Sequence, residues 1–244
     1  MFQATTELIL GECRAKLASF TGASFDAVIT DPPYSSGGMT RSDRMGQPSK
    51  KYVQTGTQLQ RPDFPGDNRD QRSFLLWSVL WMEEAFRVAR DGAPICVFTD
   101  WRQLPSVTDA LQVAGWVWRG IVVWDKTGSA RPCMGRYTNQ AEYVVWGSKG
   151  PMPRERGVGV LPGVFRHPVR QADKFHMTGK PTPLMQEIVR IVPAGSHVLD
   201  PFMGSGSTGA GCLLEGLSFT GIELDPVYYD VAAKRLHGEE RAAA

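Results

Sequence analysis

Four adjacent residues, Asp31, Pro32, Pro33 and Tyr34, combine a carboxylate, a rigid backbone and an aromatic ring directly after an apolar run. Asp31 can accept one hydrogen bond from an amino group, and the Pro32 carbonyl can accept another. Both prolines fix φ, so the two acceptors keep their direction. Tyr34 offers a ring on which a base can stack, a contact worth about 1–3 kcal/mol. The combination suits a planar, amino-bearing base, although a turn that merely ends a strand uses the same residue types.

Such a pair of acceptors has a chemical consequence for the amine that it holds. Two acceptors directed at one NH₂ group leave the nitrogen lone pair free to attack an electrophilic methyl group. Catalysis of this kind is positioning and preorganised electrostatics, and the protein supplies no nucleophile. A base must leave its duplex to reach such a pocket.

A second motif, DPFMGSGSTG, covers residues 200–209 and contains Gly204, Gly206 and Gly209 in the order G-x-G-x-x-G. It follows an expected strand and precedes an expected helix. Glu223, at the end of the next expected strand, has the spacing of a ribose-binding acid. Together these features predict a nucleotide-like cofactor, whereas the glycines alone would also fit a structural turn.

The glycine loop by itself leaves the identity of this cofactor open. No Lys-Ser or Lys-Thr pair follows the glycines, which disfavours a nucleoside triphosphate. A nicotinamide cofactor fits the glycines, but in such domains the loop usually opens the fold, and here only one βα unit follows it. S-adenosylmethionine, which has an adenosine and an amino-acid tail without a pyrophosphate, uses the same strand-loop-helix geometry.

Alternating strand-like and helix-like patterns position the two motifs. Strands are expected at residues 8–10, 26–30, 93–100, 118–126, 141–147, 197–200 and 219–225, and helices at 72–90, 105–115, 182–192, 208–216 and 226–236. This alternation predicts an α/β fold with a mostly parallel sheet covered by helices on both faces. One antiparallel hairpin is expected within this mostly parallel sheet.

Two irregular segments, 35–71 and 147–175, are longer than connecting loops need to be and carry clustered basic residues. Such charges usually mark a solvated loop, but two basic loops in one chain also suit a phosphate backbone held from two sides. Trp101 and Arg102 directly follow a strand, and strand ends are where such sheets bind ligands. The candidate nucleic-acid contacts are Arg41, Arg44, Lys50, Lys51, Trp101, Arg102, Arg154, Arg156, Arg166 and Arg170.

Length and composition narrow the class of protein. One domain spanning residues 1–244 is expected from the length and from a hydrophobic content of 42%. The net charge of +2 neither requires nor excludes nucleic acid. The four cysteines are far apart and have no histidine at ligand spacing, so no metal site is expected. No apolar run approaches a membrane span and no secretory signal is visible at the start, so a cytoplasmic protein is expected.

DPPY after a strand, with DPFMGSGST downstream, resembles the DNA amino-methyltransferases, which use S-adenosylmethionine to methylate N6 of adenine or N4 of cytosine. The order, with DPPY first and the glycine loop last, is similar to the β class of that family, in which the cofactor-binding half is permuted to the C-terminus. The resemblance implies a Rossmann-like methyltransferase fold with circularly permuted motif order. YSSGG, FTDWRQLP and VVWDK also resemble phage- or prophage-borne members.

The resemblance implies roles for individual residues. Asp31, Pro32, Pro33 and Tyr34 would hold the target base. The cofactor would be held by Asp200, Pro201, Phe202, Gly204, Gly206, Ser207, Thr208 and Glu223, and Lys180-Pro181 is similar to the segment that helps to hold its methionine part. Residues 35–71 would contact DNA. Residues 147–175 take the position of the target-recognition region, and their shortness predicts relaxed or very short sequence specificity.

The implied partner is double-stranded DNA, and several alternatives stay open. Asp31 favours adenine N6, because the cytosine enzymes more often have Ser at this position, and cytosine N4 methylation is the nearest alternative. A catalytically silent DNA-binding protein of the same fold and a structured-RNA substrate are the others. The class allows a homodimer, but no residue pattern specifies an interface, a partner endonuclease or a role in restriction-modification.

Overall fold

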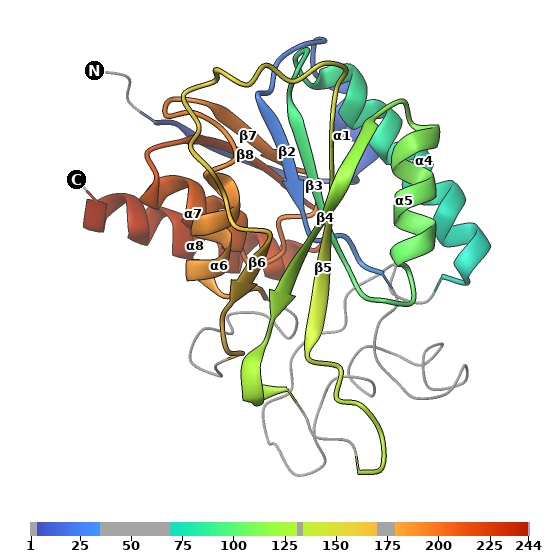
Figure 1. Cartoon of the computed structure of the whole chain (residues 1–244). Coiled ribbons are helices and arrows are strands. Elements are labelled where there is room, and N and C mark those ends of the chain that lie inside the picture. Colours follow the sequence, from blue (N-terminus) through green and yellow to red (C-terminus); the bar gives the residue numbers. More distant parts are fainter. Residues whose placement is uncertain (1–3, 35–68, 131–133, 170–178, 244) are drawn as a thin grey trace.

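The computed structural model describes residues 4–34, 69–130, 134–169 and 179–243, which form an α/β fold around one eight-stranded sheet (Figure 1). The strands are β1 (Thr6–Leu10), β2 (Ala27–Thr30), β3 (Pro94–Thr99), β4 (Val117–Asp125), β5 (Ala141–Ser148), β6 (Val164–Arg166), β7 (His197–Asp200) and β8 (Ser218–Glu223). Their order in the sheet is β1-β8-β7-β2-β3-β5-β4-β6. Every neighbouring pair is parallel except β5 with β3 and with β4. The expected mostly parallel sheet and its antiparallel hairpin are confirmed.

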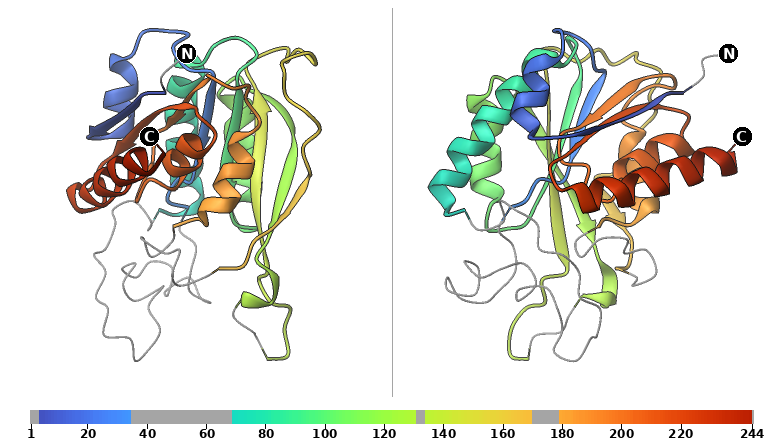
Figure 2. Two further views of the ribbon diagram at one scale, coloured as in Figure 1. Left: turned by 90° about the vertical axis from the view of Figure 1, so that its left-hand side faces the viewer. Right: turned by 180° about the vertical axis from the view of Figure 1, so that it is seen from behind.

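Helices cover both faces of the sheet, as the right-hand view of Figure 2 shows. They are α1 (Cys13–Ser19), α4 (Gln71–Val88), α5 (Leu104–Val113), α6 (Thr182–Val189), α7 (Ser207–Leu214) and α8 (Pro226–Ala243), with a 3-10 turn η1 (Thr127–Ser129). Trp81 and Leu111 belong to the core beneath α1, α4 and α5. Met185 and Leu236 belong to a second core beneath α6, α7 and α8. A sheet buried on both faces explains why β2 and β3 are continuous buried runs.

The connections from β2 and β7, which are neighbours in the sheet, lead in opposite directions. From β7 the chain passes through α7 to β8, and from β2 it returns through α4 to β3 on the other side. Open α/β sheets bind ligands in the crevice outside the carboxyl ends of two such strands. Asp31 directly follows β2, and the glycine loop directly follows β7. The topology therefore brings both sequence motifs to the crevice.

Two elements of the structure were not expected from the sequence. Helix α1 begins after Glu12, whose carboxylate accepts a hydrogen bond from the Ala15 amide at 2.8 Å. Glu is not one of the usual N-cap residues, and a helix of seven residues is too short to show a periodic apolar face. Strand β6 lies inside the segment 147–175 that was expected to be irregular, and it pairs with β4 through three residues. A pattern of three residues gives no readable alternation.

The packing of α7 against α6 generates a prediction about Gly211. A Cβ added there would lie 2.8 Å from the Met185 carbonyl carbon and 2.9 Å from the Gln186 nitrogen, so a backbone would have to shift. Gly211→Ala should lower the free energy of unfolding by about 1–3 kcal/mol. Gly238→Ala in α8 is the matched control, because its Cβ would meet nothing within 4 Å among the described residues. It should raise stability by about 0.5–1 kcal/mol. Urea unfolding curves measure both, and effects of the same sign would contradict this packing.

Candidate base and cofactor site

A buried hydrogen bond joins the two motifs where β2 and β7 end. Thr30 Oγ1 donates to Asp200 Oδ1 at 2.6 Å, and the two residues are 0% and 1% exposed. Thr30 directly precedes Asp31, so the bond fixes the base motif relative to the glycine loop. Asp200 also accepts from the Phe202 amide at 3.0 Å and from the Thr208 hydroxyl. Asp200 therefore organises both motifs from beneath the crevice.

Burial raises the pKa of Asp200 from 3.8 to about 6, because the carboxylate loses its hydration. Hydrogen bonds from Thr208, Thr30 and the Phe202 amide lower the pKa, and the negative charge of Asp31 raises it further. The hydrogen bonds thus compensate only part of the cost of desolvation. Asp200 is ionised at neutral pH at the expense of stability.

The glycine loop lies between Asp200 and Glu223. Gly206 is the N-cap of α7 in the left-handed conformation, with φ 79°, which favours glycine. The Glu223 carboxylate accepts from the Gly204 amide at 2.9 Å and from the Asp225 amide at 2.8 Å. Burial raises the pKa of Glu223, although these amide hydrogen bonds lower it. The predicted ribose-binding acid therefore lies directly across from the loop.

Phe202 and Arg235 hold this loop from its two sides. The Phe202 ring lies 5.3 Å from the Trp77 ring and 5.2 Å from the Trp81 ring, measured between centroids, so α4 closes an apolar side. The buried Arg235 guanidinium donates to the Ser205 carbonyl and the Ser207 hydroxyl, each at 3.2 Å. It also donates to Thr182 Oγ1 at 2.7 Å. Sequence reasoning missed Arg235, which lies inside a helix 26 residues or more from the motif that it holds.

The base motif is part of a group of alternating charges. Lys180 Nζ lies 2.6 Å from Asp31 Oδ2 and 3.4 Å from Glu142 Oε2. The Tyr34 hydroxyl donates to the same Glu142 oxygen at 3.2 Å, and Lys126 Nζ donates to Glu142 Oε1 at 3.1 Å. That Lys180 helps to hold the cofactor stays a prediction, and in the structure its ammonium lies against Asp31. Glu142, on β5, was missed because no local motif marks it.

The charges of this group support one another. Burial lowers the pKa of Lys180, but the negative charges of Asp31 and Glu142 raise it, and the net shift is upward. Burial raises the pKa of Glu142, but Lys180 and Lys126 lower it, and the net shift is downward. Lys180 is therefore protonated and Glu142 ionised at neutral pH.

Three of the predicted nucleic-acid contacts lie at the same edge of the sheet as Asp31. Trp101 and Arg102 follow β3, and Trp101 is 54% exposed. The Arg102 guanidinium lies 5.0 Å from the Trp101 ring centroid and forms an ion pair with Asp100 at 2.9 Å. Arg166 ends β6, which is parallel to β4, and its side chain is largely exposed beside Asp125 at 3.4 Å.

Arg154 and Arg156 lie at the opposite edge, so the structure does not bring them to the site. The Gly92 amide, before β3, donates to the Lys149 carbonyl at 2.7 Å, and Arg156 donates to the Ile191 carbonyl, before β7, at 2.9 Å. Figure 1 shows the segment between β5 and β6 crossing the top of the molecule, while the arrows of β4 and β6 point downward. The physical reason is that β5 runs antiparallel to β3, so the chain leaves it at the amino ends of the parallel strands.

The remaining predicted contacts lie outside the described residues. They are Arg41, Arg44, Lys50, Lys51 and Arg170, together with most of the segment 35–71.

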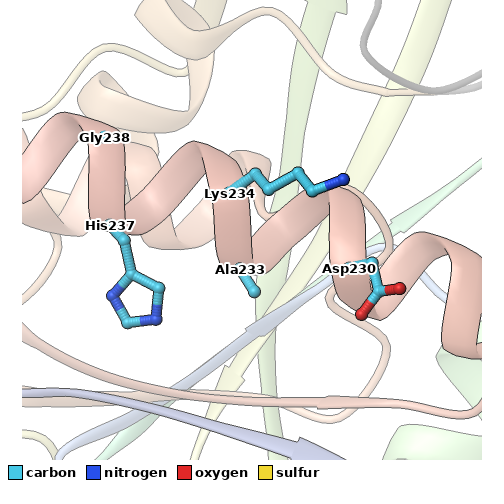
Figure 3. Close-up of a pocket in the computed structure, with 5 residues that line it drawn as sticks. All are labelled: Asp230, Ala233, Lys234, His237 and Gly238. Atoms are coloured by element: carbon cyan, nitrogen blue, oxygen red, sulfur yellow. The ribbon is translucent and has the colours of Figure 1, made fainter.

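A surface hollow of about 420 Å³ lies elsewhere, on α8 (Figure 3). The described residues that line it, Asp230, Ala233, Lys234, His237 and Gly238, come from that one helix. Within the described ranges, no three His, Cys, Asp or Glu side chains gather where they could hold a metal ion. Nor does any helix in those ranges have the length and apolar character needed to cross a membrane. The crevice between β2 and β7 therefore stays the candidate site.

Comparison with known proteins assigns the family. The sequence family described as DNA methylase, whose name joins N6 and N4 methyltransferases, matches residues 25–234. The chain belongs to this DNA methylase family. The methylase is 26% identical over 238 residues to YubD of Escherichia coli (strain K12), which is named as a methylase. This match covers 97% of this chain and 92% of YubD. It is 27% identical over 252 residues to the Type II methyltransferase M.HinfI of Haemophilus influenzae, over 94% of this chain and 67% of M.HinfI.

Solved structures share the fold of the methylase. The complex of M1.HpyAVI with S-adenosylmethionine has a TM-score of 0.69 at 23% identity and covers 95% of this chain and 98% of its own. The PvuII DNA methyltransferase, which is cytosine-N4-specific, has a TM-score of 0.69 at 15% identity. This match covers 99% of this chain and 93% of the PvuII chain. The predicted Rossmann-like methyltransferase fold is confirmed. As a member of its family, the protein is a DNA methyltransferase with S-adenosylmethionine as cofactor.

The raised pKa of Asp200 predicts a pH-dependent contribution to stability. In the folded protein Asp200 keeps its proton to a higher pH than in the unfolded chain, so its contribution is fully present below about pH 4 and is lost as pH rises through about 6. At about 1.4 kcal/mol for each tenfold change in proton affinity, the loss is about 3 kcal/mol. Asp200→Asn does not titrate and should lack this loss. Urea unfolding of both proteins from pH 4 to pH 7 measures it, and parallel pH profiles would contradict the assignment.

Proposed function

We propose that the methylase transfers the methyl group of S-adenosylmethionine to N6 of an adenine flipped out of duplex DNA. The observation that carries the proposal is the Thr30–Asp200 hydrogen bond, which holds the acid of the base motif and the glycine loop at one crevice. Adenine is favoured over cytosine because Asp31, rather than Ser, begins the base motif. Cytosine N4 methylation is the second candidate, and the PvuII enzyme, which has the same fold, acts on that base.

The base motif would position the amine for transfer. Asp31 and the Pro32 carbonyl accept its two hydrogens, and the fixed φ of Pro32 and Pro33 keeps these acceptors aligned. The ammonium formed by transfer is acidic enough to lose its proton to water, so this chain needs no general base. Tyr34 would stack on the base, and its hydroxyl is held by Glu142 at 3.2 Å.

The residues around the glycine loop fit the cofactor. A Cβ added at Gly204 would meet nothing within 4 Å in the described part of the chain, so the loop has open space above it for a ligand. The Glu223 carboxylate, which accepts one amide hydrogen on each oxygen, keeps further lone pairs for two ribose hydroxyls. Asp200, Pro201, Phe202, Gly206, Ser207 and Thr208 would shape the rest of the pocket. When bound, S-adenosylmethionine supplies the electrophilic methyl group.

Basic and aromatic side chains at the same edge would hold the DNA. Trp101 and Arg102 follow the carboxyl end of β3 and Arg166 ends β6, on the side of the sheet where Asp31 lies. Arginines of this kind contact phosphates and give affinity without sequence information. The segment 35–71, which directly follows the base motif in the sequence, would add further contacts.

Replacement of Asp31 tests the proposed chemistry. Asp31→Ala removes an acceptor for the amine and should lower the rate of methyl transfer at least about 100-fold, as loss of one preorganised polar contact does. The cofactor affinity should stay unchanged, because Asp31 lies on the base side of the crevice. The measurement is transfer of labelled methyl to unmethylated duplex DNA, followed by mass spectrometry of the nucleosides.

Asp230→Ala, on the exposed surface of α8, is the control and should transfer at the wild-type rate. N6-methyladenine that disappears only with Asp31→Ala is the expected result. N4-methylcytosine would instead select the second candidate. Absence of transfer to any duplex by the wild-type protein would refute the proposal and direct attention to RNA or to a silent DNA-binding protein.

The short segment 147–175 generates a prediction about sequence specificity. Among its described residues, only those from β6 to residue 169 lie at the edge of the sheet that carries Asp31, since the part around Arg156 lies at the opposite edge. Few side chains of this segment are therefore available to read the major groove. Mapping of methylated positions on random-sequence DNA should give a very short or degenerate motif. One long, fixed motif would overturn the prediction.

A further inference from the structure

One carboxylate outside both motifs is connected to the aromatic ring and to the acid of the base motif. Glu142 Oε2 accepts a hydrogen bond from the Tyr34 hydroxyl at 3.2 Å and lies 3.4 Å from Lys180 Nζ. Lys180 Nζ donates in turn to Asp31 Oδ2 at 2.6 Å. Glu142, which follows Tyr34 by 108 residues, therefore reaches Tyr34 directly and Asp31 through one ammonium.

The fold gives Glu142 a rigid position. It belongs to β5, which lies between β3 and β4 in the sheet, and it is paired with Trp124 of β4. Lys126 Nζ donates to Glu142 Oε1 at 3.1 Å, so the carboxylate is held at both of its oxygens. A side chain fixed in this way on an interior strand holds its partners more precisely than a loop residue does.

The bond from Lys180 leaves Asp31 able to take the target amine. The ammonium bonds to Oδ2, and a carboxylate has about four acceptor sites on its two oxygens. A charge-assisted hydrogen bond at one oxygen is strong, so it fixes the plane of the carboxylate and with it the direction of the other oxygen. The ion pair therefore orients Asp31 for the amine.

Stability alone does not explain buried charges at this place. The Lys180 side chain is 4% exposed and the Glu142 side chain 18%. Taking two charges out of water costs so much that apolar side chains of similar volume often stabilise a fold as well. Ion pairs do fix directions, and a misplacement of about 1 Å at a reacting centre can lower a rate about 100-fold. Positioning is thus the better explanation of the pair.

We propose that Glu142 is a positioning residue for methyl transfer, which fixes the Tyr34 ring directly and the Asp31 carboxylate through Lys180. Glu142 contacts these side chains and does not contact the base. Its purpose rests on the proposed function, in which Asp31 and Tyr34 hold the base, whereas the connection among the four side chains does not.

Glu142→Gln tests the part of the proposal that acts through Lys180. Glutamine keeps the volume and an oxygen that can accept from Tyr34, but it has no charge for Lys180. The rate constant of a single turnover, with cofactor and unmethylated duplex DNA saturating, should fall at least about tenfold. The dissociation constant of S-adenosylmethionine should stay within twofold. Rates are expressed per cofactor-binding site, so unfolded protein does not count, and a wild-type rate would overturn the proposal.

Glu215→Gln is the matched control. Glu215 pairs with Arg190 at 2.8 Å, and its side chain is 24% exposed, close to the value for Glu142. It follows α7 at the end away from the glycine loop. Glu215→Gln should leave the rate constant and the cofactor affinity unchanged. A loss of rate as large as that of Glu142→Gln would show a general effect of removed charge and would overturn the proposal.

Lys180→Met separates base positioning from cofactor binding. It should lower the single-turnover rate constant at least about tenfold and leave the dissociation constant of S-adenosylmethionine within twofold. In this background Glu142→Gln should lower the rate by no more than about twofold further, because the ammonium that it holds is gone. A weakened cofactor affinity with an unchanged rate at saturation would overturn the proposal, as would a second full loss of rate in the double variant.

Tyr34→Phe tests the direct contact. The variant keeps the ring that stacks on the base and loses only the hydroxyl that Glu142 holds. The single-turnover rate constant should fall at least about threefold, while the cofactor affinity stays unchanged. An unchanged rate would show that the ring needs no support from Glu142 and would overturn the proposal.

Melting temperatures separate this inference from the proposed function. A wild-type protein that methylates no DNA would refute the proposed function. Without DNA or cofactor, the double variant with Glu142→Gln and Lys180→Met should lose at least about 2 °C less than the sum of the two single losses, because the pair is removed as a unit. Additive losses would overturn the connection between Glu142 and Lys180 itself.

Discussion

The hydrogen bond from Thr30 to Asp200 is the constraint on which the site depends. It joins residues 170 positions apart in the sequence and lies beneath the crevice where the connections from β2 and β7 diverge. A donor one residue before Asp31 and an acceptor at the start of the glycine loop leave the two motifs little freedom to move apart. The same carboxylate holds Thr208 and the Phe202 amide, so one buried acid sets the position of both halves. Its high desolvation cost is balanced only in part, which is typical of a site preorganised at the expense of stability.

The two halves of the crevice above this hydrogen bond are held together by different kinds of interaction. The cofactor half uses backbone amides, a left-handed glycine and an aromatic wall formed by Phe202 with Trp77 and Trp81. The base half is held by ion pairs. Their spatial order is Lys126, Glu142, Lys180 and Asp31, so each charge lies next to one of opposite sign. Isolated charges would not be stable there, but charges of alternating sign stabilise one another.

The sequence predicted those parts of the site whose signal is local. DPPY, the glycine loop and Glu223 each lie beside a strand with a clear apolar pattern, so their place at strand ends followed directly. Glu142, Lys180 and Arg235 act through residues far away in the sequence, and their roles depend on the order of strands in the sheet. The position of Arg154 and Arg156 at the opposite end of the strands could not be predicted for a related reason, because apolar alternation does not reveal that β5 runs antiparallel to β3. Strand existence is encoded locally, whereas strand direction is a property of the whole sheet.

The outermost strand has a consequence for how the protein is made. β1 pairs only with β8 in the sheet, and the Thr5 amide is bonded to the Ser218 hydroxyl, 213 residues later. Contacts of such long range form late in folding, because the loop between them must close first. During synthesis on the ribosome, β1 therefore stays an unpaired strand until β8 has emerged. For that time it needs protection from pairing with strands of other chains.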